Sequence, residues 1–383
     1  MRWGTAQEAG FRPEALERAF GVVAERSGGR EVPAAVAAVG RGAVAVGPRA
    51  FGWAVFSPED QRAPARPDTV FDLASLTKVV GTATAVWRLI EDGRLSLGDR
   101  LAEVLPVFAE APEGEPDGWR RAVTVRHLLT HTAGLPAWRD LARVAGDRGA
   151  RLRACAATPL EAQPDARCLY SDLGFILLGW LVEEIAAQSL DVFCRRACFL
   201  PLGMVDTGWC PADVVAVRAA ATEWVASPSG AGHLRGHVHD ENARALFGLA
   251  GHAGLFSTCA DLAVFASALL AEGSGQGPGR PPYRLLAPAS VARMRARAVE
   301  GDDASRTYGW QGSGRRTGPY GDLWSQQAFG HTGFTGTSLW IDPVQDVWMV
   351  LLTNAVHMGR QVGLPAVGRL RTYFHNAVIA ALA

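Results

Sequence analysis

The chain of 383 residues is long enough to bury a large core, and its length allows either several domains or one elaborated α/β unit. Its 38 basic and 38 acidic residues give a formal net charge of zero. Such a chain has no field that attracts nucleic acid or an anionic membrane, so we expect neither partner and predict a small-molecule or short-peptide substrate. No apolar stretch reaches the roughly 18 residues of a membrane span, and the opening "MRWGTAQEAGF" has no signal-peptide pattern. We therefore expect a soluble, cytoplasmic protein, whose oligomeric state the sequence leaves open.

The cysteines do not suggest a disulfide framework, because they are scattered along a chain much longer than typical disulfide scaffolds. Cys194 and Cys198 lie four residues apart, but no second ligand pair nearby would complete a zinc site. We expect reduced and mostly buried thiols at all six positions: Cys155, Cys168, Cys194, Cys198, Cys210 and Cys259.

The N-terminal part predicts strands followed by a helix. In the stretch 31–56, "EVPAAVAAVGRGAVAVGPRAFGWAVF", glycines separate runs of valine and alanine, a pattern that predicts two or three short strands. From Ser75 to Asp92 the sequence is mostly apolar and is followed by Gly93. This predicts a central helix that ends in a glycine cap.

Sheet character returns near the C-terminus. The runs "GTSLWIDP" and "VWMVLLTN" are β-rich and joined by a turn, and "VGRLRTYFHNAVIAALA" predicts a final amphipathic helix. Before them, the glycine- and proline-rich stretch 271–282 reads as a surface loop. Strands from both ends of the chain would then build one sheet.

Between these strand-rich regions the patterns are helical. We therefore predict a single catalytic domain, 1–383, of the α/β (α+β) class. In it, an antiparallel sheet is flanked by the N- and C-terminal helices. A helical subdomain of roughly 95–240 would be inserted into an α/β subdomain formed by 1–94 and 241–383.

The stretch "FDLASLTKVV" places Ser75 three residues before Lys78, so that both lie on one face of a helix. A serine hydroxyl needs a base to become a nucleophile, and a lysine can serve if burial lowers its pKa. The apolar flanks predict such burial. The helix N-terminus would add backbone N–H groups near a developing oxyanion. A capping serine and a solvent-reaching lysine would give the same pattern.

Two further motifs favour the catalytic interpretation. "CLYSDLGF" contains Tyr170 and Asp172, and "FGHTGFTG" contains His331, Thr332 and Gly333. Their order and spacing match the elements that accompany S-x-x-K in penicillin-interacting enzymes. With "TVRHLLTHTAGLPAW" and "FLPLGMVDTGW", the chain resembles the serine hydrolases of the β-lactamase and penicillin-binding protein superfamily, on the side of class C β-lactamases, esterases and D-aminopeptidases.

The resemblance implies a β-lactamase/transpeptidase-like fold and the following roles. Ser75 would be the acylated nucleophile, Lys78 would help to deprotonate it, and Tyr170 would transfer protons to and from the leaving group. The backbone N–H groups of Ser75 and Phe334 would form the oxyanion hole. Thr332 would bind substrate. No cofactor is needed.

Two departures from the family pattern bear on specificity. Asp172 stands where penicillin-recognising members have an asparagine, and a carboxylate beside Lys78 favours the charged lysine, so Tyr170 would become the more important base. His331 replaces a lysine, which removes a permanent cation. Both changes argue against a dedicated penicillinase.

The stretch "GHVHDENARALFGLAGHAGLFST" is unusually polar. It resembles a segment of exo-acting N-acetylmuramoyl-L-alanine amidases, in which case it would line the pocket. The predicted substrate-binding residues are His239, Asp240, Glu241 and Asn242, together with Gly333. A metal site is the alternative, but the spacing fits no common zinc motif, and we predict none.

We therefore expect a serine hydrolase that forms an acyl-enzyme with an amide or ester, most simply a cell-wall-derived muropeptide. A general carboxylesterase and a true β-lactamase are the alternatives. A non-catalytic penicillin-binding-like module is disfavoured, because Ser75, Lys78 and Tyr170 are all present.

Overall fold

The computed structural model describes residues 1–383 except 111, 117, 228–229, 276–282, 301–304, 314–317 and 319. The part of the predicted surface loop that falls in 276–282 therefore lies outside the described residues. The longer helices are α1 (Pro13–Arg26), α2 (Thr84–Glu91), α6 (Arg148–Ala156), α7 (Asp172–Ala186), α12 (Cys259–Leu270), α13 (Pro288–Arg295) and α14 (Arg360–Ile379). The shorter ones are α3 (Leu101–Val104), α4 (Trp119–Ala122), α5 (Val125–Leu129), α8 (Leu190–Cys194), α9 (Leu200–Leu202), α10 (Asp213–Ala216) and α11 (Glu241–Ala245).

One large sheet organises the molecule. Its strands follow the order β1-β3-β2-β17-β16-β15-β14-β13-β12, with β4 paired to β3. Only β1 and β3 pair in parallel. The strands are β1 (Arg2–Trp3), β2 (Ala34–Arg41), β3 (Val44–Val55), β4 (Ala63–Pro64), β12 (Val299–Glu300), β13 (Ser305–Arg306), β14 (Gln311–Gly312), β15 (Phe329–Thr332), β16 (Ser338–Asp342) and β17 (Val347–Thr353).

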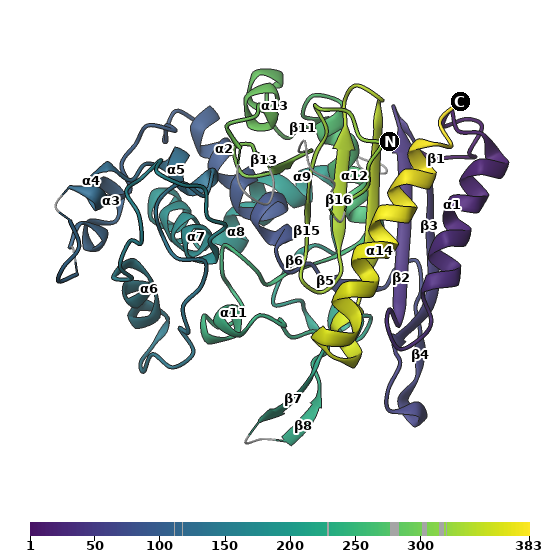
Figure 1. The fold of residues 1–383 in the computed structure, drawn as a ribbon, viewed down its shortest axis with the longest axis horizontal. Coiled ribbons are helices and arrows are strands. Elements are labelled where there is room, and N and C mark those ends of the chain that lie inside the picture. The colour runs from purple at the N-terminus through teal and green to yellow at the C-terminus, as the bar shows by residue number, and fades with distance from the viewer. Residues whose placement is uncertain are drawn as a thin grey trace.

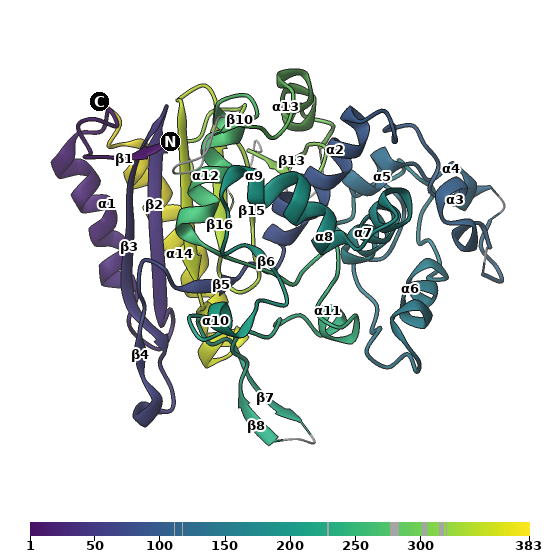
Figure 2. The same ribbon diagram turned by 180° about the vertical axis from the view of Figure 1, so that it is seen from behind.

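The two central strands explain why this sheet is buried on both faces. In β2 and β17 nearly every residue is buried, and successive side chains point to opposite sides. Ala37 and Met349 pack against α1 and α14, whereas Val36 and Val350 face the other core, which includes α12. Figure 1 shows α14 and α1 covering one face, and Figure 2, from behind, shows α12 on the other.

The sequence-based expectations for the sheet are confirmed. The stretch 31–56 forms a hairpin of two strands, which are longer than expected, and β2 pairs with β17, so both ends of the chain build the sheet. The predicted α/β class, an antiparallel sheet flanked by the N- and C-terminal helices, is also confirmed.

The predicted helix 75–92 differs in one respect. The helical run begins at Leu76, but residues Lys78–Ala83 form a π-helical segment, and regular α-helix resumes from Thr84 to Glu91. π-Helical turns are rare and frequently occur at functional sites. Within this turn, a Cβ on Gly81 would lie 2.6 Å from the ring of Trp209, so glycine permits the close packing. Gly93 follows the helix with a positive φ of 67°, as a glycine cap requires.

Helices α3 to α8 lie together on the side of the molecule away from α1 (Figure 1), which agrees with the helical patterns of that region. The exact division into subdomains stays a prediction. Among the described residues, no single helix has the length and apolarity of a membrane span. One bent pair, Asp172–Ala186 with Leu190–Leu202, meets those two criteria only when joined.

A small second sheet positions the site. Its order is β5-β9-β6, formed by β5 (Val70–Asp72), β9 (Leu255–Thr258) and β6 (Gly208–Trp209). Because β5 ends just before Ser75 and β9 begins just after His252, their pairing brings the polar stretch 237–252 against the nucleophile. The remaining strands form two separate pairs, β7 (Trp224–Ser227) with β8 (Gly230–His233) and β10 (Ser274–Gly275) with β11 (Tyr283–Arg284).

Candidate active site

Ser75 lies on a strained turn between β5 and the π-helical segment. The preceding residue, Ala74, has a positive φ of 47°, which an L-residue with a side chain adopts at a cost. The carboxylate of Asp72 accepts a hydrogen bond from the Ala74 N–H at 2.9 Å and one from the His239 N–H at 2.6 Å. Burial raises the pKa of Asp72 although both N–H groups oppose that shift. Asp72 thus fixes the turn that presents Ser75.

Lys78 lies directly beside the nucleophile, as the S-x-x-K spacing predicts. Its Nζ donates to Ser75 Oγ at 2.9 Å and to the backbone carbonyl of His252 at 3.0 Å, and it forms an ion pair with Asp172 Oδ1 at 2.7 Å. The side chain is fully buried. Lys78 is also the only lysine in the sequence. The alternative interpretation of the motif, a lysine that reaches solvent, is therefore wrong for Lys78.

The charge on Lys78 is set by its neighbours. Burial by itself would lower the pKa of this lysine, but Asp172 and then Tyr170 outweigh that effect, and the net pKa lies above its ordinary value. Lys78 is thus held as an ammonium. This favours the alternative in which Tyr170, and not Lys78, removes the proton from Ser75.

Tyr170 is held from the side opposite the nucleophile. Its ring lies 5.0 Å from Lys78 Nζ and 4.6 Å from the ring of His131. His131 accepts a hydrogen bond from the Ser171 N–H at 3.0 Å, and burial keeps its pKa well below the ordinary value, so it is a neutral acceptor. Ser171 in turn caps α7, whose first residue is Asp172. Tyr170 and Asp172, the two side chains that raise the pKa of Lys78, therefore both lie at the start of α7.

The turn after β15 presents the second predicted oxyanion donor. Gly333 donates its N–H to Thr337 O at 2.7 Å, and Arg371 on α14 donates to the carbonyls of both residues at 2.9 and 3.0 Å. A Cβ on Gly333 would lie 2.1 Å from Thr337 Oγ1, so only glycine fits. These contacts hold the N–H of Phe334, and Thr337 Oγ1 also bonds to Leu73 O at 3.0 Å, which ties this turn to the nucleophile turn.

His331 cannot replace the cation of the family pattern. It is buried on β15, and its Nδ1–H donates to Thr332 O at 2.7 Å, which leaves Nε2 without a hydrogen-bond partner among the described residues. Burial, together with Lys78 and Arg306, lowers the pKa of His331 to about 3. It is therefore neutral under physiological conditions.

One cleft of about 370 Å³ contains several of the predicted residues. Its lining includes Ser75, Tyr170, His331, Thr332, Gly333 and Phe334. The cleft contains two buried arginines that sequence reasoning missed. Arg306 on β13 lies 5.1 Å from the centre of the Tyr170 ring, and Arg371 has an Nε without a partner in the described part of the chain. The only indication of these arginines in the sequence was the position of Arg371 on the apolar face of the predicted last helix. The role of Asp72 was also missed, and the sequence gave no indication of it.

The predicted substrate-binding stretch 239–242 lies mostly inside the protein. Asn242 is fully buried, donates to Arg139 O and accepts from the Leu141 N–H, so it has no surface for a substrate. His239 is 4% exposed and its Nε2 contacts Glu223 at 2.9 Å. Neither lines the cleft that contains Ser75. The structure therefore leaves Asn242 outside the cleft, whereas the ring of His239, which does not line the cleft either, stacks on the ring of Phe334 with centroids 5.8 Å apart.

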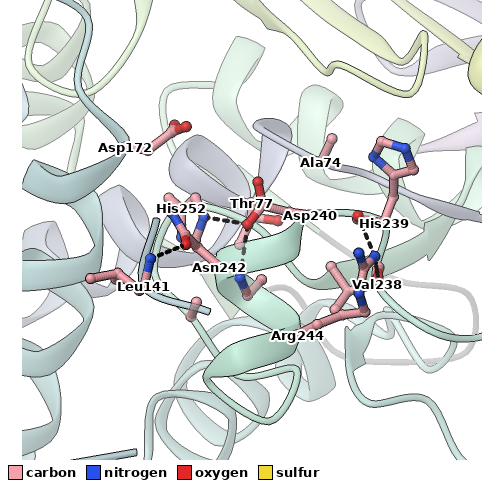
Figure 3. A network of polar contacts seen from close by, with 12 residues as sticks. Ala74, Thr77, Leu141, Asp172, Val238, His239, Asp240, Asn242, Arg244 and His252 are labelled. Carbon is pink, nitrogen blue, oxygen red and sulfur yellow. Dashed lines mark hydrogen bonds and ion pairs between the residues drawn. The ribbon is translucent and has the colours of Figure 1, made fainter. Parts of the chain in front are cut away.

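The two acidic residues of the stretch have different surroundings. Asp240 accepts a hydrogen bond from His252 Nε2 at 2.8 Å (Figure 3), and the backbone carbonyl of His252 accepts from Lys78 Nζ. Glu241 is partly exposed and forms an ion pair with Arg360, whose guanidinium lies over the ring of Phe334. Of the four residues, Glu241 is therefore the one that remains near the rim of the site.

One set of side chains has the composition of a metal site. Ligand atoms of Asp172, Asp240 and His252 all lie within 4.8 Å of one another. The Lys78 ammonium, 2.7 Å from Asp172, already supplies a positive charge to this set. A divalent ion would have to share the space with that ammonium, so the residues fit a charge network better than a metal centre.

Comparisons with known proteins agree with this geometry. The family model described as Beta-lactamase matches residues 20–370. An Escherichia coli K12 protein named "Putative D-alanyl-D-alanine carboxypeptidase" is 35% identical over 319 residues, covering 78% of this chain and 72% of that protein.

Two solved structures share the fold. EstCE1, described as a hydrolase with promiscuous acyltransferase activity, has 24% identity and a TM-score of 0.73 over 96% of this chain and 99% of its own. A class C β-lactamase of Rhodobacter sphaeroides has 22% identity and a TM-score of 0.70 over 97% and 100%. The chain therefore belongs to the β-lactamase family and is a serine hydrolase.

Proposed function

We propose that this serine hydrolase cleaves an amide of a cell-wall-derived peptide through an acyl-enzyme on Ser75. The observation behind the proposal is the contact of 2.9 Å between Ser75 Oγ and Lys78 Nζ at the base of an open cleft. An ammonium at this distance can orient the hydroxyl and stabilise the developing alkoxide, but it cannot accept the proton.

The proton of Ser75 would pass to the oxygen of Tyr170, which would take part as a phenolate beside the Lys78 ammonium, and Ser75 Oγ would attack the substrate carbonyl. The N–H groups of Ser75 and Phe334 would stabilise the oxyanion. As the C–N bond breaks, Tyr170 would return the proton to the leaving nitrogen. Water, activated by the same tyrosine, would then hydrolyse the ester on Ser75 and release the acid.

The charge of the cleft supports a substrate that has a carboxylate. Arg306 and Arg371 are both buried and line the cleft, and a guanidinium pairs well with a carboxylate. A peptide ending in D-alanyl-D-alanine has a carboxylate next to its scissile amide, and the E. coli relative is named for that bond. Hydrolysis of the muramoyl–L-alanine amide, as in the amidases that the "HDENA" stretch resembles, is the alternative bond within the same substrate class.

The substrate is identified by comparing products. The protein and its Ser75→Ala variant are incubated with a muropeptide that ends in D-alanyl-D-alanine, and the products are analysed by mass spectrometry. Loss of one alanine would establish the carboxypeptidase reaction, and release of the whole peptide would establish the amidase reaction. p-Nitrophenyl acetate and nitrocefin serve as the ester and β-lactam comparators. Slow nitrocefin turnover is expected, since His331 is neutral and Asp172 is not an amide donor.

Intact-mass analysis after incubation with a fluorophosphonate tests the acyl-enzyme. A single adduct in the wild type that is absent in Ser75→Ala is expected. No adduct on Ser75 would contradict the mechanism. Turnover of the ester without cleavage of any muropeptide would instead make a general carboxylesterase the better assignment. The expected cytoplasmic location and the expected lack of nucleic-acid or membrane partners stay predictions.

A further inference from the structure

Asp240 is a partly buried carboxylate, 23% exposed, for which the family resemblance gives no catalytic role. It caps the start of α11, where its Oδ1 accepts a hydrogen bond from the Ala243 N–H at 2.8 Å. The same oxygen accepts from His252 Nε2 at 2.8 Å. Figure 3 shows that Asp240 and His252 face each other behind the segment that contains Thr77. A helix cap alone would not need the second contact.

His252 connects this carboxylate to the catalytic lysine. Its side chain is 1% exposed, and its backbone carbonyl accepts a hydrogen bond from Lys78 Nζ at 3.0 Å. Because a carboxylate only accepts, His252 must be the donor, from Nε2, to Asp240. Asp240 therefore fixes the side chain of His252. The backbone carbonyl of the same histidine accepts a hydrogen bond from the Lys78 ammonium.

The charges around Lys78 are crowded. Carboxylate oxygens of Asp172 and Asp240 lie within 4.8 Å of each other. Two partly buried anions at such a distance repel each other unless a cation compensates them. Burial would raise the pKa of Asp240, but His252, the Ala243 N–H and Lys78 outweigh it, and the pKa lies well below its ordinary value. Asp240 is therefore ionised and in electrostatic contact with Lys78.

The remaining charged or titratable side chains around the ammonium are few. On the cleft side they are Tyr170, His131, His331 and Arg306. Burial lowers the pKa of both histidines, so they are neutral and add no positive charge. Among the described residues, Asp172 pairs directly with Lys78, and Asp240 is the second carboxylate of this set; Asp240 in turn interacts with the buried carboxyl of Asp72.

We propose that Asp240 is a second counter-ion of Lys78, and that through it the "HDENA" segment acts as a positioning element for the nucleophile and not as a wall of the substrate pocket. Asp172 binds the ammonium from the side of α7, and Asp240, together with the His252 carbonyl, supports it from the side of α11. Lys78 then remains charged throughout the reaction. The effect on turnover rests on the acyl-enzyme function proposed above, whereas the charge of Lys78 does not.

The single lysine of the chain makes this charge directly measurable. With lysine labelled at ¹³Cε, NMR shows one side-chain resonance, and its chemical shift follows the ionisation of Lys78 as the pH rises. The test variant is Asp240→Asn, whose amide oxygen can still accept from Ala243 and His252 while the negative charge is lost. The matched control is Asp147→Asn, because Asp147 caps α6 in the same way, by accepting from Ala150 N–H at 2.8 Å, but does not contact the site.

In the wild type and in Asp147→Asn, the resonance should keep its ammonium position to about pH 10 or above. In Asp240→Asn the titration should begin about one to two pH units lower. The same variant should lower kcat for p-nitrophenyl acetate several-fold and leave KM unchanged, since the ester does not reach α11. Should Asp240→Asn not fold, Asp240→Ser retains a capping oxygen and takes the same measurement.

A titration of Asp240→Asn that coincides with that of the wild type would overturn the proposal. So would a shift of equal size in Asp147→Asn, since that would indicate a non-specific effect. Fluorophosphonate labelling separates the two claims. If Ser75 is not labelled but the lysine titration shifts as expected, the acyl-enzyme function fails and the counter-ion role stands. If Ser75 is labelled but the titration does not shift, the reverse holds.

Discussion

The two sides of the Ser75–Lys78 pair are built differently. On the cleft side, Tyr170, His331 and the Phe334 turn face a space of about 370 Å³ that a substrate can enter. On the other side, three polar side chains accept hydrogen bonds from backbone N–H groups. Asp72 accepts from Ala74, Asp240 from Ala243 and Asn242 from Leu141. The cleft side offers groups for reaction and binding in the mechanism proposed above, whereas the buried side fixes the turn before Ser75 and, in the further proposal, adds a second negative charge near Lys78. A polar sequence stretch thus indicates hydrogen bonding, which can be internal as well as directed at a ligand.

The largest effect is expected for Ser75→Ala, which removes the group that both sides serve. Turnover of p-nitrophenyl acetate should fall by on the order of 10⁴-fold or more. The free energy of unfolding should change by only about 1 kcal/mol, because one hydroxyl contact with Lys78 is lost. Kinetics and chemical denaturation measure the two quantities. Activity at the wild-type level would show that the nucleophile lies elsewhere.

Tyr170→Phe tests whether the base belongs to the cleft side. Because Lys78 is held as an ammonium, loss of the phenol should lower kcat by about 10²- to 10⁴-fold. The control is the ¹³Cε resonance of Lys78, which should still report a charged lysine at neutral pH. A decrease of only a few-fold would mean that the lysine accepts the proton despite its two carboxylate neighbours.

Glu241→Gln, compared with Asp240→Asn, contrasts the rim with the buried side. Glu241 is 40% exposed and pairs with Arg360 beside Phe334, so its contact with a substrate would contribute about 0.5–1 kcal/mol. We expect kcat/KM for a muropeptide to fall about two- to five-fold, with no change for p-nitrophenyl acetate. Asp240→Asn should instead affect both substrates equally. Equal losses in the Glu241 variant would assign both residues to the scaffold.

The pH dependence tests the neutral state of His331. A histidine whose folded pKa is lowered to about 3 has already lost its proton at every pH at which the enzyme is assayed. The pH profile of kcat/KM between about pH 5 and 9 should therefore keep its shape in His331→Gln. Loss of an ionisation near pH 6 in the variant would show that His331 titrates in the working enzyme.

The smallest effect is expected for metal removal. If Lys78 is the cation of the Asp172–Asp240–His252 set, incubation with EDTA should leave activity unchanged within error. Assay of the chelated and dialysed protein, with and without added Zn²⁺, provides the measurement. Loss of activity that zinc restores would place a metal on the buried side.

Much of the fold could be predicted because its signals are local. The glycine-separated valine and alanine runs predicted the hairpin of β2 and β3, and the apolar run "VWMVLLTN" predicted β17. The π-helical segment at Lys78 could not be predicted, since the apolar pattern of 75–92 fits a regular α-helix equally well. Its close packing of Gly81 against Trp209, more than a hundred residues away, is a tertiary contact that the local sequence does not show.

The site was predictable where motifs fix short distances and not where tertiary contacts decide. The S-x-x-K spacing predicted the contact of Lys78 with Ser75, and Asp172 was expected near the lysine. Arg306 and Arg371 reach the cleft only through strand and helix packing, so their role was not visible in the sequence. Asn242 was assigned to substrate because its stretch resembles a segment of amidases in which it would line the pocket, whereas the folded chain buries it completely.

The pairing of β2 with β17 has a consequence for the synthesis of the protein. Arg41 pairs with Val347, so 306 residues (347 − 41) must be added after β2 leaves the ribosome before its partner exists. At about 5–20 residues per second, this interval is roughly 15 to 60 seconds. During that time one edge of the β2–β3 hairpin is open to association with other chains. Arg371, which holds the oxyanion turn, is added later still. Ser75 therefore cannot become competent before Arg371 has been added, and a chain terminated before that residue would be both inactive and prone to aggregate.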